Sequence, residues 1–210
     1  VTIVYSGEVE HRDSSGGGGL IGPGDVQWMT AASGLVHTER HGADFARKGG
    51  AFEMVQLWVN LPKKDKMSKP RYQGIQNADI HKIEGDYGSV RVIAGEFEGH
   101  KGPAMTFTPI NLWDIRLQKG HKKEFKVPEN HTTAFLVLSG KVTLSEGKTI
   151  GEAEIAVLET TGTTFTIEAQ EDAKILFLGG EVINEPIVGY GPFVMNTIGE
   201  IQEAFNDYQS

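Results

Sequence analysis

The 210-residue chain contains no cysteine. This absence excludes disulfide scaffolds, zinc fingers, iron–sulfur clusters and thiol nucleophiles, because each of them needs a sulfur ligand or a reactive thiolate. The chain also lacks the run of roughly 18 to 20 apolar residues that a membrane-spanning helix needs. It has no charged start followed by an apolar stretch, which would be typical of a signal peptide. We therefore expect a protein without a membrane partner, cytoplasmic or, in a eukaryote, nuclear.

Positive charge is also scarce. The chain has 28 acidic and 20 basic side chains, which gives a formal net charge of -8. Nucleic-acid affinity depends largely on cations that neutralise phosphates, so this balance disfavours direct nucleic-acid binding. The 39% hydrophobic content, with 27 glycines and 8 prolines, is typical of a turn-rich globular protein with a real core.

The first residue is Val1 rather than methionine. Residues 1–5 (VTIVY) already have the pattern of the middle of a β-strand, with no turn before them. We therefore expect this sequence to start inside a domain, with further residues upstream.

Short β-like runs broken by glycine and proline fill most of the chain. Helical periodicity is absent from residues 1–60. The only helical signal is at the end, where Thr197 and Glu200 have the spacing of a capping box before IGEIQEAFNDY. Many short strands with glycine-rich turns favour β-barrels over a parallel-sheet enzyme. We predict an all-β protein with a short C-terminal helix.

A change of composition suggests where the chain divides. Residues 62–74 (PKKDKMSKPRYQG) are rich in lysine and contain two prolines, which is typical of a linker or an exposed connection. We place a boundary near Asn77, between a domain at residues 1–77 and a domain at residues 78–210.

The two halves resemble each other. Residues 4–9 (VYSGEV) recur as residues 137–142 (VLSGKV), and Ile21-Gly22 recurs as Ile150-Gly151. An ungapped continuation aligns His37 with Thr166 and Glu39 with Glu168. This pattern predicts a tandem duplication of a β-barrel.

The copies differ in chemistry at His37-Thr38-Glu39. Residues i and i+2 of a strand point to the same face, so His37 and Glu39 extend together. An imidazole and a carboxylate on one face suit iron, manganese, nickel or zinc. A tight site generally needs at least three protein ligands, so we expect the others from elsewhere in the protein.

Residues 7–39 (GEVEHRDS…GPGDVQWMTAASGLVHTE), 56–62 (QLWVNLP) and 191–197 (GPFVMNT) resemble the pirin family. The resemblance implies two tandem cupin barrels with one metal, usually Fe(II), in the N-terminal barrel. It implies His37 and Glu39 as metal ligands, with two further histidine ligands upstream of Val1. Residues 1–77 would then be an N-terminal cupin truncated at its start, and residues 78–210 a metal-free cupin with the terminal helix. Another divalent metal, or none in these 210 residues, stays an alternative.

The resemblance also implies a function. Bacterial pirin-like proteins are associated with quercetinase activity, in which O₂ cleaves the central ring of a metal-bound flavonol. Glu39 would then be both a ligand and the catalytic base for the flavonol hydroxyl, and His37 a structural ligand. The alternative is a non-enzymatic metal-bearing regulator that binds transcription factors or metabolic enzymes. A metal-free scaffold is a third alternative, in which His37 and Glu39 are remnants.

The remaining histidines are weaker candidates. We interpret His11 as an exposed residue at a strand end, and His41 as either a neighbour of the metal ligands or a loop residue. Four others have no partner at ligand spacing and are predicted to lie on the surface: His81, His100, His121 and His131.

Overall fold

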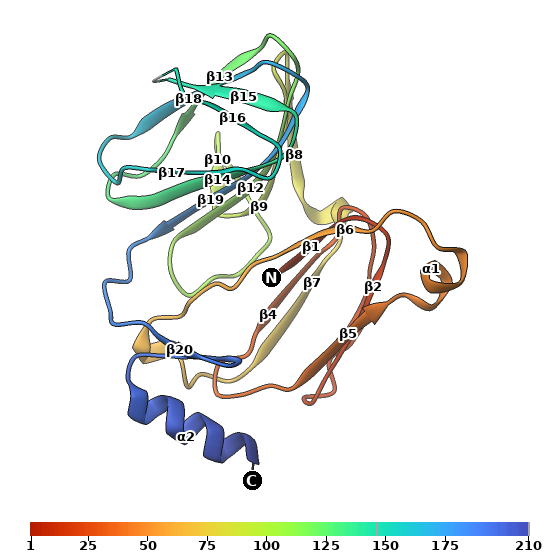
Figure 1. The fold of residues 1–210 in the computed structure, drawn as a ribbon, viewed down its shortest axis with the longest axis vertical. Helices are drawn as coiled ribbons and strands as arrows, with labels where there is room; N and C mark the ends of the chain where they lie inside the picture. Colours follow the sequence, from red (N-terminus) through yellow and green to blue (C-terminus); the bar gives the residue numbers. More distant parts are fainter. Residues whose placement is uncertain (146, 210) are drawn as a thin grey trace. The chain divides into compact units, whose positions relative to one another are not determined.

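Strands dominate the computed structural model of the protein, which describes residues 1–145 and 147–209 (Figure 1). The chain forms two units, one of residues Val1–Asn77 with Ile183–Ser210 and one of residues Ala78–Val182. Each unit contains a barrel of two sheets. The prediction of an all-β protein is confirmed.

Seven strands build the barrel of the first unit. One sheet has the order β6-β1-β4-β7 and the other has the order β3-β2-β5. All of the neighbouring strands pair antiparallel. The strands are β1 (Thr2–Ser6), β2 (Val9–Asp13), β3 (Gly18–Ile21), β4 (Val26–Thr30), β5 (His37–His41), β6 (Glu53–Gln56) and β7 (Arg71–Ile75).

The second unit has a larger barrel with an aromatic core. Its main sheet has the order β17-β14-β19-β12-β9-β8, and the facing sheet has the order β13-β18-β15-β16. Trp113 stacks on Phe177 at 4.3 Å between ring centroids, and Phe165 stacks on Phe177 at 5.7 Å. The strands are β8 (His81–Gly85), β9 (Gly88–Ala94), β10 (Glu96–Phe97), β11 (His100–Lys101), β12 (Ile110–Leu117), β13 (Lys122–Lys126), β14 (His131–Ser139), β15 (Lys141–Leu144), β16 (Thr149–Gly151), β17 (Ile155–Leu158), β18 (Thr164–Ala169) and β19 (Ala173–Glu181).

The strand pairings of the two barrels repeat. In the first barrel β1 pairs with β4 and β6, and β2 pairs with β3 and β5. In the second barrel β14 pairs with β17 and β19, and β15 pairs with β16 and β18. Even one turn recurs, since Gly22 N–H donates to the Asp25 carboxylate at 2.9 Å and Gly151 N–H donates to the Glu154 carboxylate at 2.7 Å. The predicted duplication into tandem cupin barrels is confirmed.

The register corrects one detail of the predicted alignment. Val9 pairs with His41, and its repeat partner Val142 pairs with Ala169. Counting back along the two strands places Phe165, not Thr166, at the position of His37. The ungapped alignment is wrong here because the connection that precedes β18 is one residue shorter than the connection that precedes β5.

The structure also contains a helix that the sequence did not predict. Helix α1 (Ala43–Lys48) has six residues, with Asp44 in its first turn and Arg47 and Lys48 in its last turn. A helix of fewer than two turns leaves no periodic apolar signal, whereas these charges suit the helix dipole. Neither α1 nor α2 (Ile198–Gln209), the two α-helices of the described residues, is long and apolar enough to cross a membrane.

The C-terminal segment folds with the first unit. Thr197 caps the start of α2 as predicted, since Glu200 N–H donates to Thr197 Oγ1 at 3.2 Å. The segment also contains strands β20 (Val188–Tyr190) and β21 (Phe193–Met195). Lys66, which the sequence placed in a linker, is buried and donates from Nζ to the Val194 carbonyl at 3.1 Å. The predicted division put residues 183–210 in the second domain, and these contacts group them with residues 1–77 instead.

Candidate metal centre

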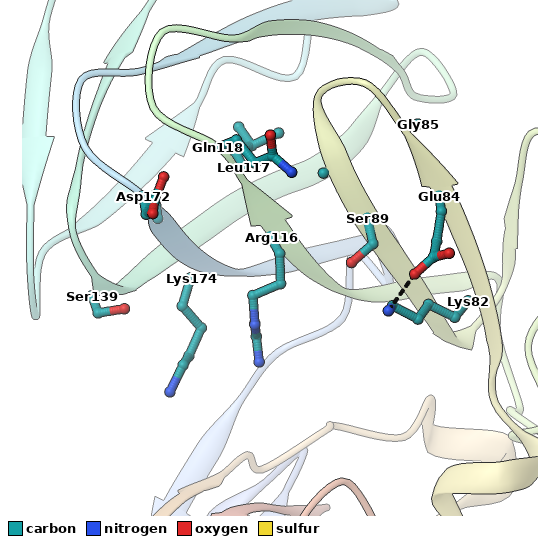
Figure 2. A pocket seen from close by; sticks show the side chains of 12 residues that line it. Lys82, Glu84, Gly85, Ser89, Arg116, Leu117, Gln118, Ser139, Asp172 and Lys174 are labelled. Carbon is teal, nitrogen blue, oxygen red and sulfur yellow. Dashed lines mark hydrogen bonds and ion pairs between the residues drawn. The ribbon is translucent and has the colours of Figure 1, made fainter.

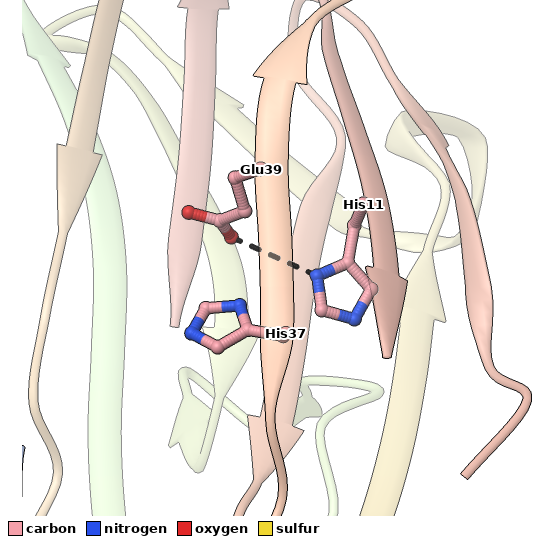
Figure 3. Close-up of side chains that lie close together, drawn as sticks. All are labelled: His11, His37 and Glu39. Carbon is pink, nitrogen blue, oxygen red and sulfur yellow. Dashed lines mark ion pairs between the residues drawn. The ribbon is translucent and has the colours of Figure 1, made fainter. Parts of the chain in front are cut away.

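Three donor side chains lie together on two adjacent strands of the first barrel (Figure 3). His37 and Glu39 lie two residues apart on β5, and both extend from the same face of the strand. His11 on β2 pairs directly with Glu39 across the ladder. One potential ligand atom from each side chain lies within 4.8 Å of the others. Two imidazoles and a carboxylate therefore converge on one point.

The carboxylate of Glu39 is held from the opposite sheet. Its Oε1 accepts hydrogen bonds from Gln27 Nε2 at 2.6 Å and from Thr2 Oγ1 at 3.4 Å. Its Oε2 accepts a hydrogen bond from Gln56 Nε2 at 2.8 Å. Glu39 therefore extends into the barrel interior, where a carboxylate needs such donors to offset the free-energy cost of its desolvation.

Tyr72 on β7 orients one of these donors. Its hydroxyl donates to Gln27 Oε1 at 3.3 Å, which directs the amide nitrogen of Gln27 towards Glu39. Burial raises the pKa of Tyr72, and the nearby carboxylates of Asp13 and Glu39 raise it further. The phenol therefore keeps its proton at neutral pH and stays a donor.

His11 is buried, so the prediction of an exposed histidine is wrong. No part of its side chain is exposed. The polar run EHRD on β2 alternates: Glu10 and Arg12 form an ion pair at 2.7 Å on one face, while His11 and Asp13 lie on the other. The alternation of Val9, His11 and Asp13 was the signal available in the sequence.

Asp13 connects His11 to the glycine-rich turn after β2. Its Oδ2 lies 3.2 Å from His11 Nε2, and its Oδ1 accepts hydrogen bonds from the Ser15 hydroxyl at 2.6 Å and from Gly17 N–H at 2.9 Å. The hydrogen bond from Ser15 is the largest of the effects that lower the pKa of Asp13 to about 2, with smaller contributions from His11 and the two backbone N–H groups. A Cβ on Gly17 would lie 2.5 Å from the Asp13 carboxylate, so only glycine fits there without a shift.

The second barrel has apolar side chains at every equivalent position. The strand pairings define these equivalences, because both barrels have the same ladders. The fold therefore does not itself require polar groups at this place. The equivalent pairs are Thr2 and Phe135, Gln27 and Ala156, Gln56 and Phe177, His11 and Leu144, His37 and Phe165, and Glu39 and Ile167.

The chain is similar to known proteins over its full length. Residues 1–59 match the family model described as Pirin, and residues 112–210 match the model described as Pirin C-terminal cupin domain. The chain is 49% identical, over its full length and 74% of the relative, to a Pseudomonas aeruginosa protein named "Putative quercetin 2,3-dioxygenase". It is 38% identical, over its full length and 71% of the relative, to a "Pirin-like protein" of Solanum lycopersicum. The chain belongs to the pirin family.

A solved structure agrees with this assignment. The crystal structure of a protein named quercetin 2,3-dioxygenase from Acinetobacter baumannii superposes on this pirin with a TM-score of 0.97 and 52% sequence identity. The match covers 99% of this chain and 73% of the other. Both cupin barrels of the pirin therefore have close counterparts in an experimental structure.

The other histidines of the pirin lie outside the cluster. His41 is exposed at the end of β5, and its ring contacts Phe52 at 4.7 Å between centroids. His81 and His100 are exposed as predicted, and their rings lie 6.0 Å apart. His121 and His131 are half-buried. Among the residues that the structure describes, only His11, His37 and Glu39 form a group of three potential metal ligands.

A hollow of about 540 Å³ in the second unit has different chemistry (Figure 2). It contains acidic and basic side chains side by side, and Lys82 forms an ion pair with Glu84. It contains no histidine. Its charged side chains are Lys82, Glu84, Arg116, Asp172 and Lys174. This hollow therefore offers no comparable donor set.

The residues of the cluster fit a divalent metal. Imidazole nitrogens with a carboxylate suit iron, nickel, manganese or zinc. His11 Nδ1 is buried and has no hydrogen-bond partner among the described residues, although it faces Glu39 Oε1 at 3.9 Å. Hydrogen bonds from Gln27 and Gln56 fix the carboxylate, as outer partners of metal ligands commonly do. Pirins usually bind a metal, and the first barrel has a His-His-Glu group that suits one.

Proposed function

We propose that this pirin is a metal-dependent oxygenase that holds one iron ion in its first barrel and cleaves a flavonol with O₂. His37 and Glu39 are the proposed ligands from this chain. The substrate class comes from relatives named quercetin 2,3-dioxygenase, at 49% and 52% identity. We infer iron from the family resemblance, and imidazole and carboxylate donors are suitable ligands for it.

One observation carries the proposal: the interior of the first barrel is polar where that of the second is apolar. Glu39 extends into the first barrel and accepts three hydrogen bonds, whereas Ile167 fills the same place in the second. Burying the carboxylate of Glu39 costs free energy, whereas burying the apolar side chain of Ile167 does not. The same fold forms without the polar set, so the polar set supports a function beyond folding.

The protein's own side chains have distinct roles in this proposal. Gln27, Gln56 and Thr2 fix the carboxylate of Glu39 so that it does not reorient when a ligand binds. His37 is exposed and lies beside Glu39, which leaves this side of the cluster accessible to a substrate. When bound, the metal supplies a Lewis acid and a redox partner for O₂. The apolar second barrel contributes stability and no ligand.

Oxygen uptake tests the proposal. Iron-loaded, full-length protein should consume O₂ in the presence of quercetin and release carbon monoxide. Glu39→Ala should abolish this uptake, because it removes a proposed ligand. Glu168→Ala is a matched control, since Glu168 lies exposed on β18 of the second barrel and should leave uptake unchanged. If the iron-loaded protein consumes no O₂ with quercetin, the oxygenase proposal fails. That result would favour the alternative of a non-enzymatic, metal-bearing regulator.

A further inference from the structure

We propose that His11, oriented by Asp13, is a specificity-determining residue whose Nδ1 accepts a hydrogen bond from the hydroxyl group of the substrate. This inference rests on the proposed function, because it concerns the flavonol hydroxyl at the same site. It assigns a role to a buried pair that metal binding by His37 and Glu39 does not explain.

Asp13 determines which nitrogen of His11 carries the proton. The Asp13 carboxylate can only accept hydrogen bonds, and it lies 3.2 Å from His11 Nε2. Its other oxygen is held by Ser15 and Gly17, so the carboxylate does not turn away. His11 therefore carries its proton on Nε2, and in the neutral imidazole Nδ1 keeps its lone pair.

The lone pair on Nδ1 has a fixed direction. The imidazole stacks on the ring of Tyr72 with a centroid distance of 5.0 Å and an interplanar angle of 16°. The side chain is fully buried. Nδ1 faces Glu39 Oε1, and no described residue donates to it. A buried acceptor without a donor costs free energy, so this atom points to a ligand that supplies one.

His11 Nδ1 and Glu39 Oε1 lie 3.9 Å apart, which is too far for a hydrogen bond between them. Glu39 Oε1 accepts hydrogen bonds from Gln27 and Thr2 instead. With His37 and Glu39 as the proposed metal ligands, His11 Nδ1 lies beside them, within reach of a group bound at the metal.

The missing donor is best supplied by an acidic hydroxyl. Both oxygens of Glu39 already accept hydrogen bonds from the protein, whereas His11 Nδ1 accepts none. A flavonol has a hydroxyl group next to its ring ketone, and this O–H group is a good donor. We therefore assign acceptance of this hydroxyl to His11, in place of the role as base that the family resemblance suggested for Glu39. The second barrel has Leu144 at the position of His11, so the fold does not require an imidazole there.

Nuclear magnetic resonance tests the orientation of His11 without any metal or turnover. Long-range ¹H–¹⁵N spectra of the metal-free protein should show His11 protonated on Nε2 and unprotonated on Nδ1. In Asp13→Asn, the amide replaces an acceptor by a donor, so the proton should move to Nδ1. Wild-type protein with the proton on Nδ1 would overturn the inference. So would a zinc-induced shift typical of a coordinated nitrogen at Nδ1, because His11 would then be a metal ligand.

Equilibrium binding tests the recognition itself. Zinc-loaded protein, used to prevent turnover, is titrated with quercetin and with luteolin, which lacks the 3-hydroxyl group. We expect the preference for quercetin to fall about tenfold in His11→Leu, which introduces the residue of the second barrel, and in Asp13→Asn. Asp25→Asn is the matched control, since Asp25 also accepts hydrogen bonds in a turn of this barrel, and it should keep the wild-type preference.

The outcomes separate this inference from the proposed function. If wild-type protein prefers quercetin and His11→Leu keeps that preference, the role of His11 is rejected and the substrate class stands. If only water occupies the position next to Nδ1, Asp13→Asn also keeps the wild-type preference, which rejects the role as well. If wild-type protein binds neither flavonoid, the proposed substrate class fails and the inference fails with it, whatever the spectra show for His11.

Discussion

Gln27 on β4 donates a hydrogen bond of 2.6 Å to Glu39 on β5, and this bond joins the two sheets of the first barrel through its interior. In the second barrel the equivalent residues are Ala156 and Ile167, which have no polar side-chain atoms. The two barrels therefore differ at this pair of positions, which is polar in the first barrel and apolar in the second. The same ladders surround a polar cluster in one unit and an apolar core in the other.

Loss of this hydrogen bond should weaken metal binding. Gln27→Ala introduces the residue of the second barrel and leaves Oε1 of Glu39 with only the long contact to Thr2. Removal of an outer partner of a metal ligand typically lowers metal affinity about 10- to 100-fold. Competition with a chelator should show a decrease in this range. Gln170→Ala, on the exposed surface of the second unit, should bind metal like the wild type.

The Asp13 carboxylate should make stability depend on acidic pH. Its pKa falls from an ordinary 3.8 to about 2 in the folded state, chiefly through the hydrogen bond from Ser15. A carboxyl group whose pKa is lowered by folding stabilises the folded state at pH values above its ordinary pKa. This stabilisation is lost as the pH falls towards the pKa of the folded state. Urea unfolding should therefore show the wild type losing its advantage over Asp13→Asn between about pH 4 and pH 2. A constant difference between the two proteins across this range would contradict the assignment.

A core substitution in the second barrel should separate stability from metal binding. Phe177 is fully buried and stacks on Trp113 and Phe165. Phe177→Ala should lower the free energy of unfolding by about 3 to 5 kcal/mol, because it leaves a cavity. The folded variant should keep the metal stoichiometry of the wild type. A variant that folds and has lost its metal would show that the second barrel takes part in the site.

Much of the fold was predictable because it depends on local patterns. The alternation and the glycine turns gave the all-β class, and the recurrence of VYSGEV as VLSGKV gave the duplication. The shared face of His37 and Glu39 followed from the two-residue period of a strand. Each of these features can be predicted from residues that are close together in the sequence.

The rest of the cluster depends on register, which a single sequence does not determine. His11 meets Glu39 because β2 pairs with β5 across 28 positions of the chain, and a shift of one residue would turn His11 to the other face. Gln27 and Gln56 come from the opposite sheet, so their contacts with Glu39 need the barrel to close. Polar residues within the apolar runs VQWMT and MVQLWVN were the only local sign of them.

Native mass spectrometry of iron-loaded, full-length protein tests the central claim most directly, because it counts bound metal ions per chain. We expect one iron in the wild type and none in a His37→Ala, Glu39→Ala double variant, while the Glu168→Ala control keeps one. A double variant that still holds one iron, or a wild type that holds none after loading, would contradict the assignment of the first barrel as the metal-binding unit.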